Sequence, residues 1–376
     1  MTNFFSLSLF LCSSRFSVNF LQMVSLAGGL PLQWPDALQV MFDSFSTVSS
    51  AGTTLMNPDC ELTSIRTVEA FYLKQIVYTF SVPMIVFVCI IIWTIIKCCC
   101  QKRMKLNSDK IKDHTVLSIV LMLFLCYPML VKKSLSMLKC PFVGEVKYLL
   151  ADLQEPCFIG NHLHYFLLLT VPQIVLYVVG LPFMATLIIV RNKQKLHQDK
   201  RFSTRYSLLY MGYRKGREWW EVVIVMRKVA VVSIGTFGTV MGVVDLQAFL
   251  ALGIVFISIV THLAFQPFDV NTKNGKMLHQ LEFIALCVAW FTFWGGLLYF
   301  IGHEKSGSVH KNVLFVTTIL LVLANSTFLL YSISSFVREY LKDRKTAEKR
   351  DEKNKKNKSQ VVPIDKENEG VKEWKE

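Results

Sequence analysis

The chain has 376 residues, of which 52% are hydrophobic and 18% are charged, and it carries a formal net charge of +14. Apolar runs of about twenty residues, the length that crosses a bilayer core, recur along it. They exclude an ordinary water-soluble domain, whose helices are apolar on one face only. We therefore predict an all-α fold, a polytopic transmembrane helix bundle that lies in the plasma membrane or an endomembrane.

Eight apolar segments predict about eight membrane spans within a helical domain of residues 16–336. They cover residues 16–32, 74–97, 115–133, 163–190, 221–244, 246–265, 281–301 and 313–336. The first span is the least apolar, because it contains Asn19, Gln22 and the pair Gly28 and Gly29. Prolines inside the spans predict kinks. They are Pro83, Pro128, Pro172 and Pro182.

Residues 1–15 precede the first predicted span and form an N-terminal segment of their own. The apolar stretch NFFSLSLFLC, residues 3–12, fits either the core of a signal peptide or the end of a truncated upstream helix. No strongly basic start precedes it, and no clear A-x-A-like cleavage site follows. Both interpretations stay open.

Basic residues concentrate in three stretches that fall on one side of an eight-span bundle. Residues 97–114 contain six Lys and Arg, residues 191–218 contain nine, and the tail after Val337 contains thirteen. Because short basic loops stay cytosolic, we expect both termini in the cytosol. Anionic inner-leaflet lipids are the partners that these loops favour, and we expect no nucleic-acid partner.

The C-terminal residues 337–376 are highly charged. Ten acidic residues interleave with the thirteen basic ones, and few apolar side chains are present to bury. This composition predicts a disordered cytosolic tail.

The cysteines divide by side of the membrane. Cys140 and Cys157 share one outward-facing stretch, where an oxidising compartment allows a disulfide, and Cys60 lies in another outer loop. A bridge between Cys140 and Cys157 is preferred, although three cysteines permit three pairings.

Three adjacent cysteines, Cys98, Cys99 and Cys100, follow the second predicted span on its cytosolic end. This is a common setting for S-palmitoylation. Three neighbouring thiols lack the ligand spacing of a structural zinc site, so we expect no metal there.

No signature of catalysis is found in the sequence. It contains no Walker loop, no HExxH, no GxSxG elbow and no Rossmann glycine fingerprint. His162 and His164 are two residues apart, which places them about 200° apart on a helix and prevents easy sharing of a metal. We therefore expect neither an enzyme nor a bound cofactor.

The fifth predicted span carries charges that are costly in a membrane. Glu221 lies near its cytosolic start, and Arg227 and Lys228 follow about 10 Å deeper. Either the long side chains snorkel back to the headgroups, or one of them faces the bundle interior and pairs with a group on another helix. We expect Glu282, near the cytosolic start of the seventh span, to be that partner.

Six stretches occur in an order that resembles one family. They are LQMVSLAGGLPLQWPDAL (21–38), NPDC (57–60), CYPMLVKKSLSMLKC (126–140), YLLADLQEPCFIGNHLHYF (148–166), VVGLPFMATLIIVRNKQKL (178–196) and YSLLYMGYRKGREWWEVVIVMRKV (206–229). The chain resembles the TRP-like, or polycystin-like, multi-pass membrane proteins of single-celled eukaryotes over residues 16–340. Larger members carry a cysteine-rich ectodomain, so a short paralogue or a truncated chain is expected here.

The resemblance implies a cation channel or channel-like subunit, and homo-oligomers are compatible with it. Conduction is expected among the later spans, with Glu145, Asp152 and Glu155 attracting cations to the outer mouth. The outer connections at residues 242–245 and 302–311 are too short for a long re-entrant filter. Two alternatives stay open: a non-conducting membrane scaffold or receptor, and a lipid or small-solute transporter.

Overall fold

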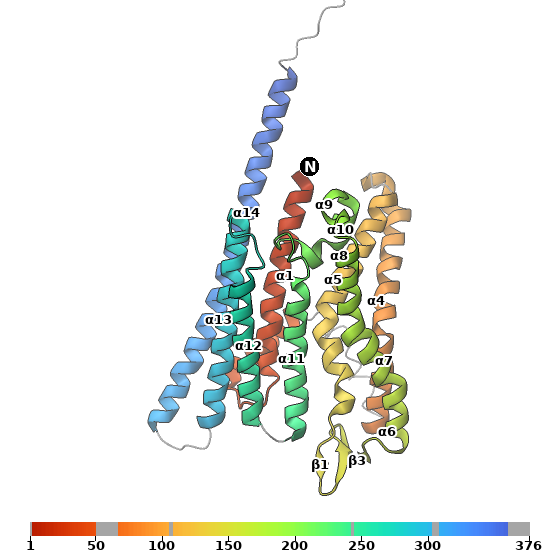
Figure 1. The fold of residues 1–376 in the computed structure, drawn as a ribbon, viewed down its shortest axis with the longest axis vertical. Coiled ribbons are helices and arrows are strands. Elements are labelled where there is room, and N and C mark those ends of the chain that lie inside the picture. Colours follow the sequence, from red (N-terminus) through yellow and green to blue (C-terminus); the bar gives the residue numbers. More distant parts are fainter. Residues whose placement is uncertain (1, 50–66, 105–107, 242–243, 303–307, 360–376) are drawn as a thin grey trace, which may run out of the picture.

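The computed structural model describes residues 2–49, 67–104, 108–241, 244–302 and 308–359 as a bundle of long helices (Figure 1). Helices α12 to α14 lie on one side of the bundle and α4 to α8 on the other. The helices α1 (Thr2–Gly28) and α11 (Trp220–Met241) lie between these two groups. Contacts of α1 with α13 and α14, and of α11 with α5 and α12, connect the two halves.

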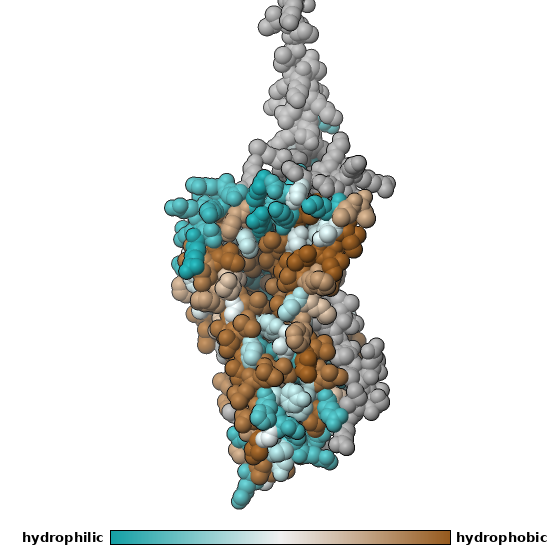
Figure 2. Space-filling model, turned by 90° about the vertical axis from the view of Figure 1, so that its right-hand side faces the viewer, coloured by the Kyte–Doolittle hydropathy of each residue, from teal (hydrophilic) through white to brown (hydrophobic). Residues whose placement is uncertain are grey.

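Six of the described helices are long and apolar enough to cross a bilayer. They are α4 (Thr67–Met104), α5 (Ser108–Ser134), the interrupted helix from Gly160 to Arg191, α12 (Val244–Phe265), α13 (Lys273–Gly302) and α14 (Ser308–Ser359). Figure 2 shows a hydrophobic middle between two more hydrophilic ends. The chain thus has the make-up of a multi-pass membrane protein, and six of the predicted spans coincide with these helices.

The first helix extends beyond its predicted bounds. α1 runs from Thr2 to Gly28, so residues 2–15, predicted as a separate segment, belong to the same helix as residues 16–28. It ends at Gly28 because Gly29 and Pro31 follow within three residues. α1 and α11 are two further long helices beside the six apolar ones.

The helix from Gly160 to Arg191 is interrupted twice. Its α-helical parts are α6 (Gly160–Tyr165), α7 (Val171–Gln173) and α8 (Leu181–Arg191), and its π-helical parts are η3 (Phe166–Thr170) and η4 (Ile174–Gly180). Pro172 and Pro182 each remove a backbone donor, and the wider π turns absorb the break. Pro83 and Pro128 lie inside α4 and α5.

A short helix that the sequence did not predict turns back along α1. α2 (Asp36–Ser49) buries Leu38, Phe42 and Phe45 against the bundle, and the Gln22 side-chain amide of α1 donates to the Ser49 carbonyl at 3.0 Å. With 14 residues it is about 21 Å long. It therefore stops inside the bundle, level with Gln22. Residues 50–66, including Cys60, lie outside the described residues.

A small sheet occupies the end of the bundle opposite the N-terminus (Figure 1). Strands β1 (Phe142–Val143), β2 (Val146–Leu149) and β3 (Asp152–Pro156) pair antiparallel in sequence order, after the short 3-10 helix η2 (Ser136–Leu138). A disulfide joins Cys140 and Cys157 across 17 residues. This bond fixes the base of the sheet. We call this end of the bundle, opposite the basic loops, the outer end, and strands β1 and β2 the outer hairpin.

The basic segment after α8 is helical and lies at the same end as the N-terminus. It forms α9 (Lys195–Gln198) and α10 (Lys200–Tyr210), and the Asp199 carboxylate accepts from the Arg201 backbone amide at 2.9 Å as an N-cap. Arg205 of α10 binds Asp113 of α5 at 2.6 Å. The end of α4 lies at this same end, so both basic loops share one side.

The last helix continues far beyond the predicted span. α14 reaches Ser359, so the prediction of a disordered tail is wrong for residues 337–359. This stretch consists mainly of Lys, Arg and Glu, which favour a helix even without packing. α14 ends on the side where α1 begins (Figure 1).

The packing of α2 yields a stability prediction. Phe42 is 1% exposed and meets the Trp34 ring edge-on at 4.9 Å between centroids, so Phe42→Ala should lower the free energy of unfolding by about 3–5 kcal/mol. Val40 on the same helix is 65% exposed, and Val40→Ala should change it by less than about 0.5 kcal/mol. Thermal unfolding of the purified chain in detergent measures both. Equal effects would show that α2 is not packed in the bundle.

Candidate functional site

Ionised side chains gather inside the bundle where α1, α11 and α13 meet. We call this group the interior charge cluster, and its members are Arg15, Glu221, Arg227, Lys228 and Glu282. All five side chains are less than a tenth exposed. Four of these residues were singled out from the sequence. Arg15 was missed, because it was assigned to a segment outside the first span.

The ion pair expected from the sequence is present. Arg227 of α11 donates from Nη2 to Oε1 of Glu282 on α13 at 3.2 Å. Both side chains are buried, so this charge-assisted hydrogen bond is shielded from water and salt. It ties α11 to α13.

Glu221 has partners on α1 and in the loop before α11. Arg15 Nε lies 3.6 Å from Glu221 Oε2, and the Tyr213 hydroxyl donates to the same oxygen at 2.7 Å. The Arg15 guanidinium also donates to the carbonyls of Leu208 and Met211 and stacks over the Tyr213 ring. Burial, with the charge of Glu221 in addition, raises the pKa of Tyr213 well above its ordinary value. Tyr213 is therefore a neutral hydrogen-bond donor at physiological pH.

Lys228 is held differently from the other members of the cluster. Its Nζ donates to Asn19 Oδ1 at 2.5 Å and to Gln22 Oε1 at 2.6 Å, both on α1, and lies 4.8 Å from the centre of the Phe124 ring. The residue is 2% exposed. The snorkelling interpretation is therefore wrong for Lys228. Asn19 and Gln22 were noted in the sequence only as polar residues that weaken the first span.

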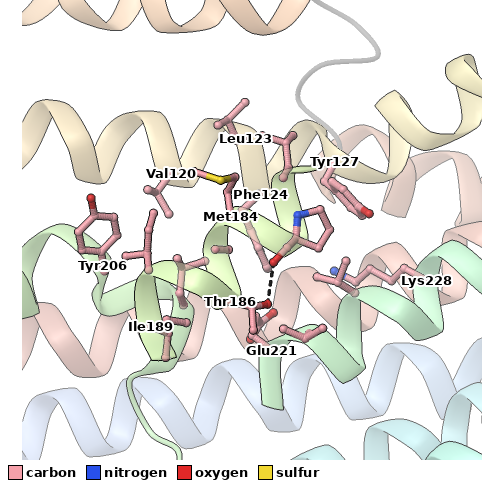
Figure 3. Close-up of a pocket in the computed structure, with 17 residues that line it drawn as sticks. Val120, Leu123, Phe124, Tyr127, Met184, Thr186, Ile189, Tyr206, Glu221 and Lys228 are labelled. Carbon is pink, nitrogen blue, oxygen red and sulfur yellow. Dashed lines mark hydrogen bonds between the residues drawn. The ribbon is translucent and has the colours of Figure 1, made fainter. Parts of the chain in front are cut away.

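Lys228 lines an apolar cavity on the side of the cluster nearer the basic loops. The cavity holds about 200 Å³ between α5, α8, α10 and α11, and Figure 3 shows Glu221 and Lys228 on one wall of it. The remaining lining is almost entirely apolar or aromatic, with Phe124 and Tyr206 among it. We call it the inner apolar cavity.

A second cavity lies on the outer side of the cluster. It holds about 250 Å³ between α1, α2, α4, α5 and α11, and Lys132, Lys133 and Lys139 line it together with Gln22. We call it the outer lysine cavity. Gln22 lines this cavity and Lys228 lines the inner one, so their 2.6 Å hydrogen bond lies between the two.

Of the three acidic residues predicted at the outer mouth, two lie together and the third, Glu145, does not. Asp152 and Glu155 line a wide outer cavity together with Glu69 of α4, which the sequence did not single out. Thr67 donates to Asp152 at 2.6 Å and Tyr72 donates to Glu155 at 3.1 Å. The hydrogen bonds from Thr67 and from the Gln154 backbone lower the pKa of Asp152. Glu145 lies apart from them, in the turn between β1 and β2.

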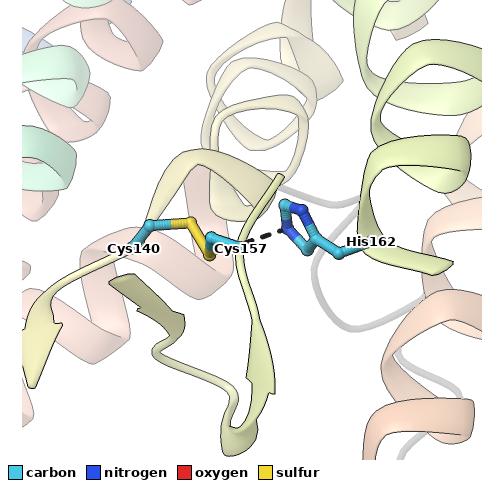
Figure 4. A group of neighbouring side chains, drawn as sticks. All are labelled: Cys140, Cys157 and His162. Atoms are coloured by element: carbon cyan, nitrogen blue, oxygen red, sulfur yellow. Dashed lines mark hydrogen bonds between the residues drawn. A yellow bond between two sulfur atoms is a disulfide. The ribbon is translucent and has the colours of Figure 1, made fainter. Parts of the chain in front are cut away.

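The disulfide lies next to a buried histidine. His162 Nδ1 accepts from the Phe158 amide at 3.0 Å, and its Nε2 lies 3.9 Å from Cys157 Sγ (Figure 4). Cys140, Cys157 and His162 are close enough for metal ligation, but both sulfurs are committed to the disulfide and provide no thiolate. The histidine therefore stabilises the turn after β3.

Cys98 and Cys99 are exposed near the C-terminal end of α4, which was predicted to be cytosolic. Exposure at a membrane boundary is what an acyl transfer requires. The Cys100 side chain lies outside the described side chains, and palmitoylation of the three residues stays a prediction.

Comparisons with known proteins give one distant similarity. No family model matches the chain. The chain is 24% identical over 224 residues to the Cysteine repeat modular protein A of Toxoplasma gondii, an alignment that covers 57% of this chain and 7% of that protein. The chain thus spans less than a tenth of the length of the curated relative that it matches. No solved structure matches.

The ion pair between α11 and α13 yields a prediction about coupling. Glu282→Gln leaves Arg227 buried without its anion and should lower the free energy of unfolding by about 3–5 kcal/mol. The double variant Arg227→Gln/Glu282→Gln should lower the free energy of unfolding by less than the sum of the two single variants, because it leaves no unpaired charge behind.

The matched control for this cycle is the pair Arg201 and Asp109, whose charged atoms lie 2.8 Å apart while the side chains are 61% and 45% exposed. Their coupling should be about 0–1 kcal/mol. Thermal unfolding in detergent gives all the required values. Additive effects at Arg227 and Glu282 would contradict an interaction between them.

Proposed function

We propose that the chain is a TRP-like integral membrane protein that acts as a channel or channel-like subunit. The ordered motifs of the sequence support the family, and the interior charge cluster supports the activity. Ionisable residues are rare in a membrane interior and typically mark ion pathways, proton relays or moving gates. Five of them meet here at the contact between two groups of helices.

In this proposal α1 and α11 complete a bundle of eight spans. They contain 27 and 22 residues, which is long enough to cross a bilayer, and their buried charges are met by partners on other helices. An even number of spans puts both termini on one side. The basic loops lie on that same side, which supports a cytosolic location for both ends. Contact of these loops with anionic inner-leaflet lipid follows from their charge.

The observation that carries the proposal is that Gln22 connects α2 to Lys228 of the interior charge cluster. Gln22 holds both the last carbonyl of α2 and the ammonium of Lys228. Helices that stop inside a membrane are tolerated where they line a cavity or a pathway, and they recur in channels and transporters. A movement of α11 would have to exchange these contacts, so the cluster is suited to hold one state of a gate.

The charges argue for a conduction path between protomers of a homo-oligomer. A cation that crossed the middle of one protomer would pass the outer lysine cavity and then Lys228, which repel it. A path along helices α12 to α14 would avoid these positive charges, because these helices lie on one side of the bundle. In this arrangement the cavity with Glu69, Asp152 and Glu155 raises the local concentration of cations on the outer side.

A transporter of lipids or small solutes is the second candidate. It is favoured by the two cavities that flank the hydrogen bond between Gln22 and Lys228. Opening that contact would join the inner and outer cavities. The interrupted helix from α6 to α8 supplies the bends that such a movement needs.

Reconstitution of the full chain in planar bilayers tests the proposal. We expect a cation current, recorded across potentials with and without membrane tension and calcium. Asp152→Asn and Glu155→Gln should lower conductance severalfold at about 0.01 M salt and little at about 1 M, where the Debye length is about 3 Å. Glu145→Gln, at a residue that does not line that cavity, is the matched control and should lower conductance less at either salt concentration.

The other outcomes of this experiment separate the alternatives. Flux of lipid or solute without current would favour the transporter. Neither flux nor current under any of these conditions would contradict a transport role and favour a scaffold or receptor.

A further inference from the structure

The outer lysine cavity concentrates positive charge that neither the fold nor the proposed channel activity uses. Lys132, Lys133 and Lys139 come from the end of α5 and the turn that follows it, and all three line the same space of about 250 Å³. Neutral polar side chains complete the polar part of its wall. They are Gln22, Ser25, Ser46, Tyr78 and Thr236.

The three ammonium groups are poorly compensated. None of the described residues that line the cavity is acidic. Asp43 of α2 attracts Lys132 but is not part of the lining, and Lys133 lies over the Tyr78 ring at 4.8 Å. Among the described residues, one carboxylate near three lysines leaves the cavity net positive.

Lys139, which lies outside the membrane spans, shows the same excess of positive charge. Burial lowers its pKa, and the charges of Lys132 and Lys133 lower it further. Groups that repel one another in this way gain stability when an anion enters between them. The cavity is larger than a phosphate group requires, and Lys132 in its wall is exposed.

We propose that the outer lysine cavity is a binding site for a phosphate group, carried either by a soluble phosphate compound or by the headgroup of a phospholipid. Lysine ammonium groups bind phosphate as point charges without a fixed geometry, which suits three lysines on flexible stems. The site does not depend on whether the chain conducts ions. A phosphate beside Gln22 would lie one side chain away from Lys228, so its negative charge would stabilise the ammonium group of Lys228 in the interior charge cluster.

Thermal unfolding of the purified full chain tests this proposal. In neutral detergent, inorganic phosphate and glycerol phosphate should raise the unfolding temperature in a saturable way, whereas chloride at equal ionic strength should not. In nanodiscs, phosphatidic acid is compared with phosphatidylcholine alone. A shift with the soluble probes identifies a free phosphate compound, and a shift only with phosphatidic acid identifies a headgroup.

Variants assign the binding to the cavity. Lys132→Gln, Lys133→Gln and Lys139→Gln should each weaken phosphate binding at least tenfold, which is about 1.4 kcal/mol. Lys147→Gln removes a lysine of the outer hairpin that stacks over Phe142 instead, and it should leave binding unchanged. Lys133→Arg, which keeps the charge, should retain binding.

A second measurement does not need variants that fold. Lysines of the native chain are acetylated with a soluble reagent and quantified by mass spectrometry, with and without phosphate or phosphatidic acid. Protection of Lys132, Lys133 and Lys139, but not of Lys147, supports the site. The proposal is overturned if no probe shifts unfolding or protects these lysines, or if Lys147→Gln weakens binding as much as the cavity variants do.

Discussion

Hydrocarbon offers neither water nor counter-ions, so every ionised or polar group at membrane depth has to find its partner within the fold. α11 brings Glu221, Arg227 and Lys228 into the bundle, and partners on α1 and α13 meet all three. Apolar side chains cannot specify such contacts, because lipid tails are as apolar as leucine. The polar contacts therefore decide that α1 and α13, rather than lipid, lie against α11. The position of α1 between the two groups of helices follows from the same requirement.

The position of α2 depends on that constraint as well. Ser49, the last described residue of α2, is buried, and a backbone carbonyl without a hydrogen-bond donor is costly away from water. Gln22 donates to the Ser49 carbonyl and accepts from Lys228, so one amide satisfies both the end of α2 and the buried ammonium. The partial negative charge at the C-terminal end of α2 also favours a cation nearby. Asn19 and Gln22, which make the first span less apolar, are thus the residues that bind Lys228 of α11, and Gln22 also binds α2.

The sequence predicted what depends on long apolar runs and on scarce charges. Six spans were located, and Glu282 was chosen as the partner of Arg227 or Lys228 because it lies near the same ends of the spans; the structure pairs it with Arg227. The partners of Lys228 were not predicted, since neutral amides on a helix 200 residues away give no signal of pairing. α2 is too short for a span, and its apolar residues face the bundle on one side only. The helix after Val337 was missed because charged composition was taken as disorder, although the same residues favour a long exposed helix.

The distribution of charge along the bundle favours the binding of an anion near the lysines but not its passage through the centre. Acidic groups gather at the edge of the outer end, lysines gather at its centre, and Lys228 lies behind them. An anion drawn to the outer lysine cavity meets next the contact between Gln22 and Lys228, and beyond it a cavity whose walls are almost wholly apolar. Leaving water for such walls costs an ionised group far more than one lysine returns, because desolvation is not compensated by hydrogen bonds there. In the proposed channel, the centre of the bundle would therefore retain a bound anion beside its lysines, and cations would pass between protomers instead.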